Sequence, residues 1–127
     1  MNKFFLVALG GAVGSVARYA LGGLTLRWFG PGWPYGTFAA NLAGGCLIGL
    51  LAGFLAHKGG GDQERVRLLL QVGVLGGFTT FSAYSLETAL MIERKAYGAA
   101  VGYAVGSVML SILAVFAGLM IARKVFA

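Results

Sequence analysis

The chain has 127 residues, of which 58% are hydrophobic and 11% carry a formal charge, and its net charge at pH 7 is +6. Soluble domains typically carry about 25% charged residues, so this chain cannot cover a water-facing surface. The composition therefore excludes an ordinary soluble enzyme, a disordered tail and a disulfide-stabilised secreted domain, and it indicates an integral membrane protein.

Four long apolar segments fill the chain and predict an all-α, single transmembrane domain over residues 1–127. A membrane-spanning helix needs roughly 20 apolar residues. The pattern predicts such helices over residues 4–26, 35–57, 66–92 and 97–122. Residues 27–34 (RWFGPGWP) predict a loop because they contain two prolines and two glycines. Residues 58–65 (KGGGDQER) predict the longest polar connection.

The basic residues lie at or beyond the ends of the apolar segments, with the exception of Arg18. This placement is typical of interfacial anchors, so no nucleic-acid partner is expected. Six basic residues fall on the side of the two termini and three on the other side: Lys3, Lys58, Arg65, Arg67, Arg123 and Lys124 against Arg27, Arg94 and Lys95. This modest bias favours cytoplasmic termini and is compatible with insertion in both orientations.

Glycines recur at every fourth position in three of the segments. The sets are Gly10 and Gly14; Gly45, Gly49 and Gly53; and Gly98, Gly102 and Gly106. Small residues at this spacing let helix backbones approach closely in lipid. The pattern therefore predicts a compact helical bundle.

Polar groups inside the apolar segments are the first candidates for function, because a charge at the bilayer centre costs roughly 2.5–3.5 kcal/mol on insertion scales. Arg18 either extends to the interface as an anchor or has an internal role, bonding to other groups or attracting anions. Asn41 either donates N–H groups to a dehydrated anion or forms an interhelical hydrogen bond.

The third segment has an unusual polar stretch, VGVLGGFTTFSAYSLE, over residues 72–87. A glycine pair loosens a helix, and hydroxyls can satisfy the backbone groups that are freed. The stretch therefore predicts a helix broken in mid-membrane, with backbone carbonyls available to an ion; the alternative is a continuous helix with self-bonded hydroxyls. Aromatic residues three apart could present positive ring edges to an anion or could face lipid or core: Phe78, Phe81 and Tyr84.

A polar stripe is also predicted on the fourth segment. Tyr103, Ser107 and Ser111 are four residues apart, so they share one helix face. Such a stripe indicates a hydrated track or a partner interface. Many hydroxyl and amide donors without a ring of acids suit a small anion better than a cation.

Taken together, these residues resemble the Fluc (CrcB) family of bacterial fluoride channels over essentially the whole chain. The resemblance is carried by GGxxG before Arg18, by Gly36-Thr37 leading to Asn41 and Gly44, and above all by GGFTTFS leading to Glu87. It implies a passive, fluoride-selective channel that exports cytoplasmic fluoride across the bacterial inner membrane. It also implies an antiparallel, dual-topology homodimer with two pores and a structural sodium ion at its centre.

The resemblance also implies roles for individual residues. The backbone carbonyls of Gly76 and Thr79 would hold the sodium ion. This chain departs from many members at Tyr84, where they have phenylalanine, and at apolar Val115, where the polar track of some members continues. The candidate pore and fluoride-binding residues are Arg18, Asn41, Thr80, Phe81, Ser82, Tyr84, Glu87, Ser107 and Ser111.

Two other functional classes are considered. A small proton-coupled multidrug or cation exporter is also a four-helix, dual-topology dimer, but its signature is an acid in the first helix, where this chain has Arg18. A non-transporting assembly subunit would not need clustered polar groups inside the membrane. An enzyme is not expected, since His57 is the only histidine and no nucleophile–base pair can be assembled.

Overall fold

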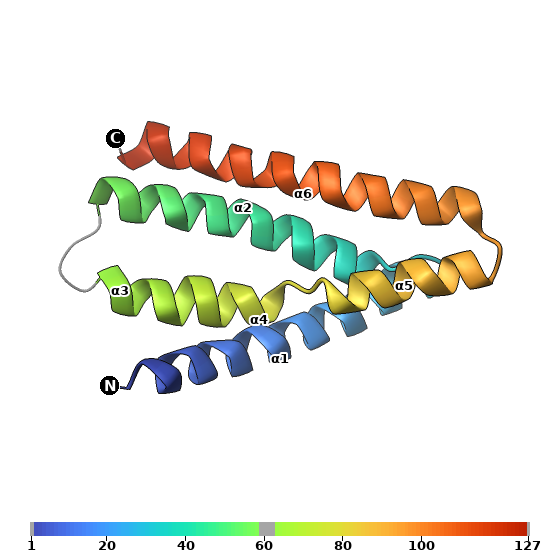
Figure 1. Cartoon of the computed structure of the whole chain (residues 1–127), viewed down its shortest axis with the longest axis horizontal. Coiled ribbons are helices and arrows are strands. Elements are labelled where there is room, and N and C mark those ends of the chain that lie inside the picture. The colour runs from blue at the N-terminus through green and yellow to red at the C-terminus, as the bar shows by residue number, and fades with distance from the viewer. Residues whose placement is uncertain (1, 59–62, 127) are drawn as a thin grey trace.

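The computed structural model describes residues 2–58 and 63–126, and the regular structure in that part of the chain is helical. The chain runs through α1 (Lys3–Phe29), α2 (Tyr35–Lys58), α3 (Gln63–Val66), the π-helix η1 (Arg67–Leu75), α4 (Gly76–Phe78), α5 (Ser82–Glu93) and α6 (Tyr97–Phe126) (Figure 1). The structure has 4 helical segments long and apolar enough to cross a membrane, with α3 to α5 forming the third. The chain is a multi-pass membrane protein.

The helices extend beyond the ends predicted from the apolar pattern. Residues 27–29 continue α1, although a loop is predicted there, because nothing before Gly30 opposes helix formation; Gly30 has a φ of 80° and donates to the Leu26 carbonyl. At the other end of the chain, α6 continues past residue 122, where Arg123 and Lys124 complement the helix dipole. Residues 59–62 of the predicted polar connection lie outside the described residues.

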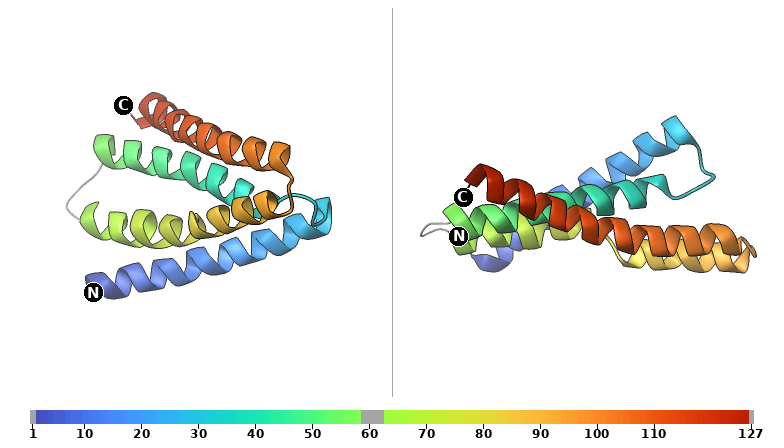
Figure 2. Two further views of the ribbon diagram at one scale, coloured as in Figure 1. Left: turned by 45° about the vertical axis from the view of Figure 1, so that its right-hand side comes forward. Right: turned by 90° about the horizontal axis from the view of Figure 1, so that it is seen from above.

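The four segments pack as two pairs. α2 lies along α6, and α1 lies along η1 and α4. α1 begins and α6 ends at the same end of the bundle (Figure 1). At the other end of the bundle, α5 and the start of α6 diverge from the end of α1 and the start of α2, as the view from above shows (Figure 2).

Glycines make both pairs close. A Cβ added at Gly14 would overlap the Val74 carbonyl oxygen, and one added at Gly10 would lie 2.8 Å from the Cα of Gly73. On the other pair, a Cβ at Gly49 would overlap the Val115 carbonyl oxygen. The predicted close approach of helix backbones is thus confirmed for Gly10 and Gly14 of α1 and for Gly45 and Gly49 of α2.

The set of glycines in the first turns of α6 behaves differently, whereas Gly118 further along that helix packs against the α2 backbone at Cys46. No described residue lies within 4 Å of a Cβ added at Gly98, Gly102 or Gly106. This set therefore packs against no helix within the described part of the single chain, and its spacing does not serve the packing of this bundle.

Gly49→Ala tests the α2–α6 packing. We expect the free energy of unfolding in detergent to fall by about 1–3 kcal/mol, since the new methyl group must displace the α6 backbone. Gly23→Ala is the matched control, because its added Cβ meets no described atom within 4 Å. That variant should keep or slightly raise the stability, since alanine favours helix over glycine by roughly 0.8–1.0 kcal/mol. Equal stability of the two variants would contradict the packing.

Candidate functional site

Residues 79–81 separate α4 from α5 in the third segment. Thr79 is extended, with φ −88° and ψ 157°, and its N–H and hydroxyl both donate to the Leu75 carbonyl at 3.0 Å. In a continuous helix the Thr80 N–H would donate to the Gly76 carbonyl. Instead it donates to Asn41 Oδ1 at 2.8 Å. The Gly76 carbonyl therefore loses its usual helical donor.

Asn41 on α2 binds both backbone groups of Thr80. Its Oδ1 accepts from the Thr80 N–H, and its Nδ2 donates to the Thr80 carbonyl at 3.0 Å. The interhelical hydrogen bond considered for Asn41 is therefore present. Because an amide nitrogen carries two N–H groups, one donor of Asn41 remains for a ligand.

Arg18 reaches the same region from α1. Its Nε donates to the Gly77 carbonyl at 3.3 Å, and the side chain is only partly exposed. This is the internal hydrogen-bonding role considered for Arg18. The guanidinium satisfies a carbonyl that the end of α4 would otherwise leave without a partner.

A cavity of about 500 Å³ opens beside residues 79–81, between α2 and α6. The Ser107 hydroxyl, whose residue is 4% exposed, is buried and has no hydrogen-bond partner among the described residues. Apolar Val115 also lines this cavity, where a longer polar track would continue. Most of the residues predicted for the site meet here: Asn41, Gly76, Thr79, Thr80, Phe81, Tyr84, Ser107 and Ser111.

The aromatic pair at this cavity is only half enclosed. The rings of Phe81 and Tyr84 have centroids 5.3 Å apart, and Phe81 is 75% exposed in the single chain. The Tyr84 hydroxyl donates to the Ala104 carbonyl at 2.9 Å, so it is held against α6. Ser82 is exposed and lies 3.2 Å, oxygen to oxygen, from the Thr80 hydroxyl.

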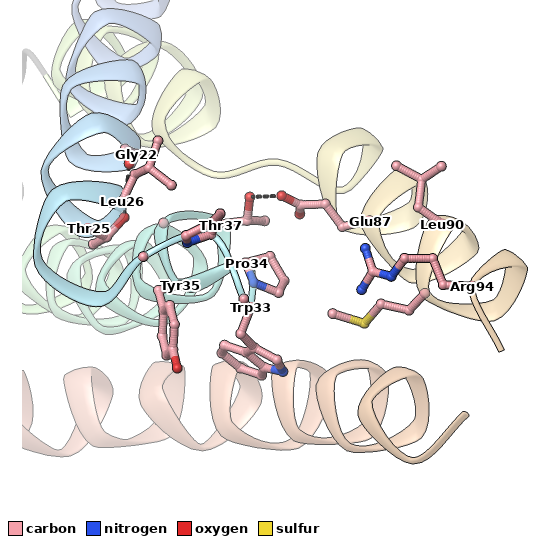
Figure 3. Close-up of a pocket in the computed structure, with 15 residues that line it drawn as sticks. Gly22, Thr25, Leu26, Trp33, Pro34, Tyr35, Thr37, Glu87, Leu90 and Arg94 are labelled. Atoms are coloured by element: carbon pink, nitrogen blue, oxygen red, sulfur yellow. Dashed lines mark hydrogen bonds between the residues drawn. The ribbon is translucent and has the colours of Figure 1, made fainter. Parts of the chain in front are cut away.

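Glu87 does not line the first cavity. Its Oε2 accepts from the Thr37 hydroxyl at 3.1 Å, and its Oε1 accepts from the Tyr103 hydroxyl at 3.0 Å. With Thr37 and Arg94, Glu87 lines a second cavity of about 310 Å³, where its carboxylate meets the Thr37 hydroxyl (Figure 3). A small polar cluster of Glu87, Thr37 and Tyr103 thus joins α5, α2 and α6.

This cluster adds two residues to the candidate site. Neither Thr37 nor Tyr103 belongs to the site residues predicted from the sequence. The four-residue spacing of Tyr103, Ser107 and Ser111 is the signal that indicates Tyr103, which is 0% exposed. For Thr37 the signals are its position one helical turn before Asn41 and its place in the Gly36-Thr37 motif that carries part of the family resemblance.

Helices able to cross a membrane, an interrupted third segment and two cavities with polar side chains in their linings define a multi-pass membrane protein. The sequence matches the family described as "CrcB-like protein, Camphor Resistance (CrcB)" over residues 5–119. The chain belongs to this family.

Similar proteins carry a more specific name. The "Fluoride-specific ion channel FluC" of Phenylobacterium zucineum (strain HLK1) is 68% identical over 127 residues, which is 100% of both chains. The protein of that name from Caulobacter vibrioides (strain NA1000 / CB15N) is 63% identical, again over 100% of both chains. That from Hyphomonas neptunium (strain ATCC 15444) is 50% identical over 100% of both.

Asn41→Leu tests whether α2 holds residues 79–81 in place. We expect amide exchange of residues 80–83 to quicken by about tenfold or more, because an unsatisfied buried polar group costs roughly 1–3 kcal/mol. Hydrogen exchange in micelles, read by mass spectrometry, measures this. Thr88→Val is the control, since Thr88 donates to the Tyr84 carbonyl within its own helix. Equal exchange in both variants would show that Asn41 does not fix this segment.

Proposed function

We propose that the chain forms a passive channel selective for fluoride, through which cytoplasmic fluoride leaves the cell across the bacterial inner membrane. The buried Ser107 hydroxyl carries this proposal, because it has no partner among the described residues and belongs to a residue that lines the same cavity as Asn41 and Ser111. A buried polar group without a partner costs free energy, and an anion that accepts from it would remove that cost. The identity of the anion follows from the relatives, which are named as fluoride-specific ion channels.

Fluoride requires close donors because it is small and strongly hydrated. The cavity offers the second N–H of Asn41 and the hydroxyls of Ser107 and Ser111. The ring edges of Phe81 and Tyr84 carry positive partial charge and can face an anion without holding it tightly. None of the described residues that line this cavity is acidic, which favours a channel for an anion over a cation exporter.

The working unit is an antiparallel homodimer with two pores. In the single chain the rim of the larger cavity is exposed at Phe81, and Gly98, Gly102 and Gly106 of α6 meet no described helix. A second, inverted copy would enclose these surfaces. The modest difference in positive charge between the two ends of the chain permits both orientations in one membrane.

A sodium ion at the centre of this dimer would be held by the Gly76 and Thr79 carbonyls of each chain. Carbonyl oxygens of unwound transmembrane helices are suitable ligands for sodium. The carbonyls of Gly77 and Thr80 already accept from Arg18 and Asn41, whereas that of Gly76 lacks its helical donor. The residues present therefore fit the ion, which would supply fixed positive charge between the pores.

Anion efflux from liposomes that contain only the purified protein tests the function. We expect fluoride to leave at least about tenfold faster than chloride, without any proton gradient, which corresponds to about 1.4 kcal/mol in the barrier. Chloride efflux as fast as fluoride efflux would refute the selectivity. Efflux that requires a proton gradient would instead indicate the proton-coupled exporter.

Two phenylalanine variants provide the matched control for this assay. Phe81→Ile should slow fluoride efflux by about tenfold or more, because the ring edge is lost. A tenfold change again corresponds to about 1.4 kcal/mol in the barrier. Phe116→Ile removes a 58% exposed ring of α6 that lines neither cavity, so the rate should stay near that of the wild type. Equal rates in both variants would remove the ring from the mechanism.

The dimer and its sodium ion are tested by exchanging sodium for N-methyl-D-glucamine. We expect light scattering to give a dimer in sodium, and we expect the exchange to lower the dimer fraction and the fluoride efflux together, with recovery when sodium returns. Potassium chloride at equal ionic strength controls for salt. An unchanged dimer fraction and an unchanged efflux rate would refute the sodium site.

The antiparallel arrangement is tested with a single cysteine, Asn2→Cys, in a chain that also carries Cys46→Ser. Labelling of this cysteine from one membrane face only would refute the antiparallel arrangement.

A further inference from the structure

We propose that the cavity of about 310 Å³ beside Glu87 is a second mouth of the anion pathway, in which Arg94 concentrates small anions from the water. This inference rests on the proposed function. The cavity lies between the end of α1, the loop after it, the start of α2 and the last turns of α5 (Figure 3). It is therefore at the far end of the bundle from the chain termini (Figure 1).

The two cavities are separated by one layer of side chains. Tyr84 lines the larger cavity, and Thr37 and Glu87 line the smaller one. Between them stands Tyr103, whose ring centroid is 5.4 Å from that of Tyr84 and whose hydroxyl donates to Glu87 at 3.0 Å. An ion that passes this layer leaves one cavity and enters the other.

A row of aromatic rings follows the same course. The centroids of Phe81 and Tyr84 are 5.3 Å apart, and those of Trp33 and Tyr103 are 5.1 Å apart at an interplanar angle of 85°. Phe81 lines the larger cavity and Trp33 lines the smaller one. Aromatic ring edges, which can face an anion, are therefore present from the larger cavity to the smaller one.

The charges of the smaller cavity favour an anion near its opening. Its charged lining residues are Glu87 and Arg94. Both carboxylate oxygens of Glu87 accept hydrogen bonds, which offset its negative charge, whereas Arg94 forms no salt bridge with a described residue. The Arg94 guanidinium points from α5 into the cavity, across from Pro34 and Glu87 (Figure 3).

The end of the molecule around this cavity also carries more basic than acidic side chains. Arg27 lies in the last turn of α1, Lys95 follows Arg94 in the turn before α6, and Glu93 is the acid beside them. Basic side chains at a pore mouth raise the local anion concentration, and the effect falls steeply with ionic strength. Of Arg27, Arg94 and Lys95, Arg94 alone lines the cavity.

Replacing Arg94 by Gln tests this role through the salt dependence of fluoride efflux. At about 10 mM ionic strength, where the Debye length is about 30 Å, we expect the initial rate to fall roughly two- to fivefold. At about 1 M ionic strength, where the Debye length is about 3 Å, the rate should lie within about 1.5-fold of the wild-type rate. Lys95→Gln is the matched control: it removes the same charge from the neighbouring residue, which does not line the cavity.

A charge series completes the experiment. Arg94→Lys should retain the wild-type rate, and Arg94→Glu should lower it further than Arg94→Gln at low salt. Equal salt dependence of the Arg94→Gln and Lys95→Gln variants would overturn the inference, as would an equal loss in Arg94→Lys and Arg94→Gln. Absence of fluoride efflux from the wild type would refute the proposed function itself, so the two failures are distinguishable.

Discussion

The site depends on one interaction, the binding of both backbone groups of Thr80 by the side chain of Asn41. An amide can do this because it carries a donor and an acceptor on the same planar group. By taking the Thr80 N–H, it removes the donor that would have continued the helix to Gly76. It also satisfies the freed groups of Thr80, which would otherwise be costly within a membrane. The interruption between α4 and α5 is therefore held from a neighbouring helix.

Close backbone packing is what brings these neighbours within reach. Gly14 lets α1 approach the backbone of η1 and α4. One turn further along α1, the Nε of Arg18 donates to the Gly77 carbonyl. On the other side, Gly49 lets α2 approach α6, so that Asn41 and Ser107 line one cavity. A larger residue at Gly14 would separate Arg18 from the Gly77 carbonyl, and one at Gly49 would move α2 and α6 apart and change the cavity between them.

The acid of the third segment is placed where its charge is balanced. Glu87 accepts from a hydroxyl on α2 and from another on α6, while the larger cavity is lined by donors and aromatic rings. A carboxylate with two O–H donors presents less negative charge to a passing anion than a free one would. The layer of Glu87, Thr37 and Tyr103 therefore stands between the two cavities without adding an unpaired acid to either.

Elements that depend on local composition could be predicted from the amino-acid sequence alone. The lengths of the apolar runs predicted the membrane-crossing helices, because a span requires a certain number of apolar residues wherever it packs. The spacing of Ser107 and Ser111 placed both on one face of α6, because helix periodicity is a local property. The π-helical turn of η1 and the extension of α1 to Phe29 had no such signal.

The partners of the polar side chains, in contrast, follow from how the helices pack in three dimensions. Asn41 and Thr80 are separated by 39 residues, and Thr37 and Glu87 by 50. Such pairs form when packed helices bring them together, and no periodicity within one segment predicts them. The same limit applies to the glycines: identical spacing brings helices together at Gly49 and leaves Gly102 without a described neighbour, because a small residue permits a close approach and the rest of the fold decides whether one occurs.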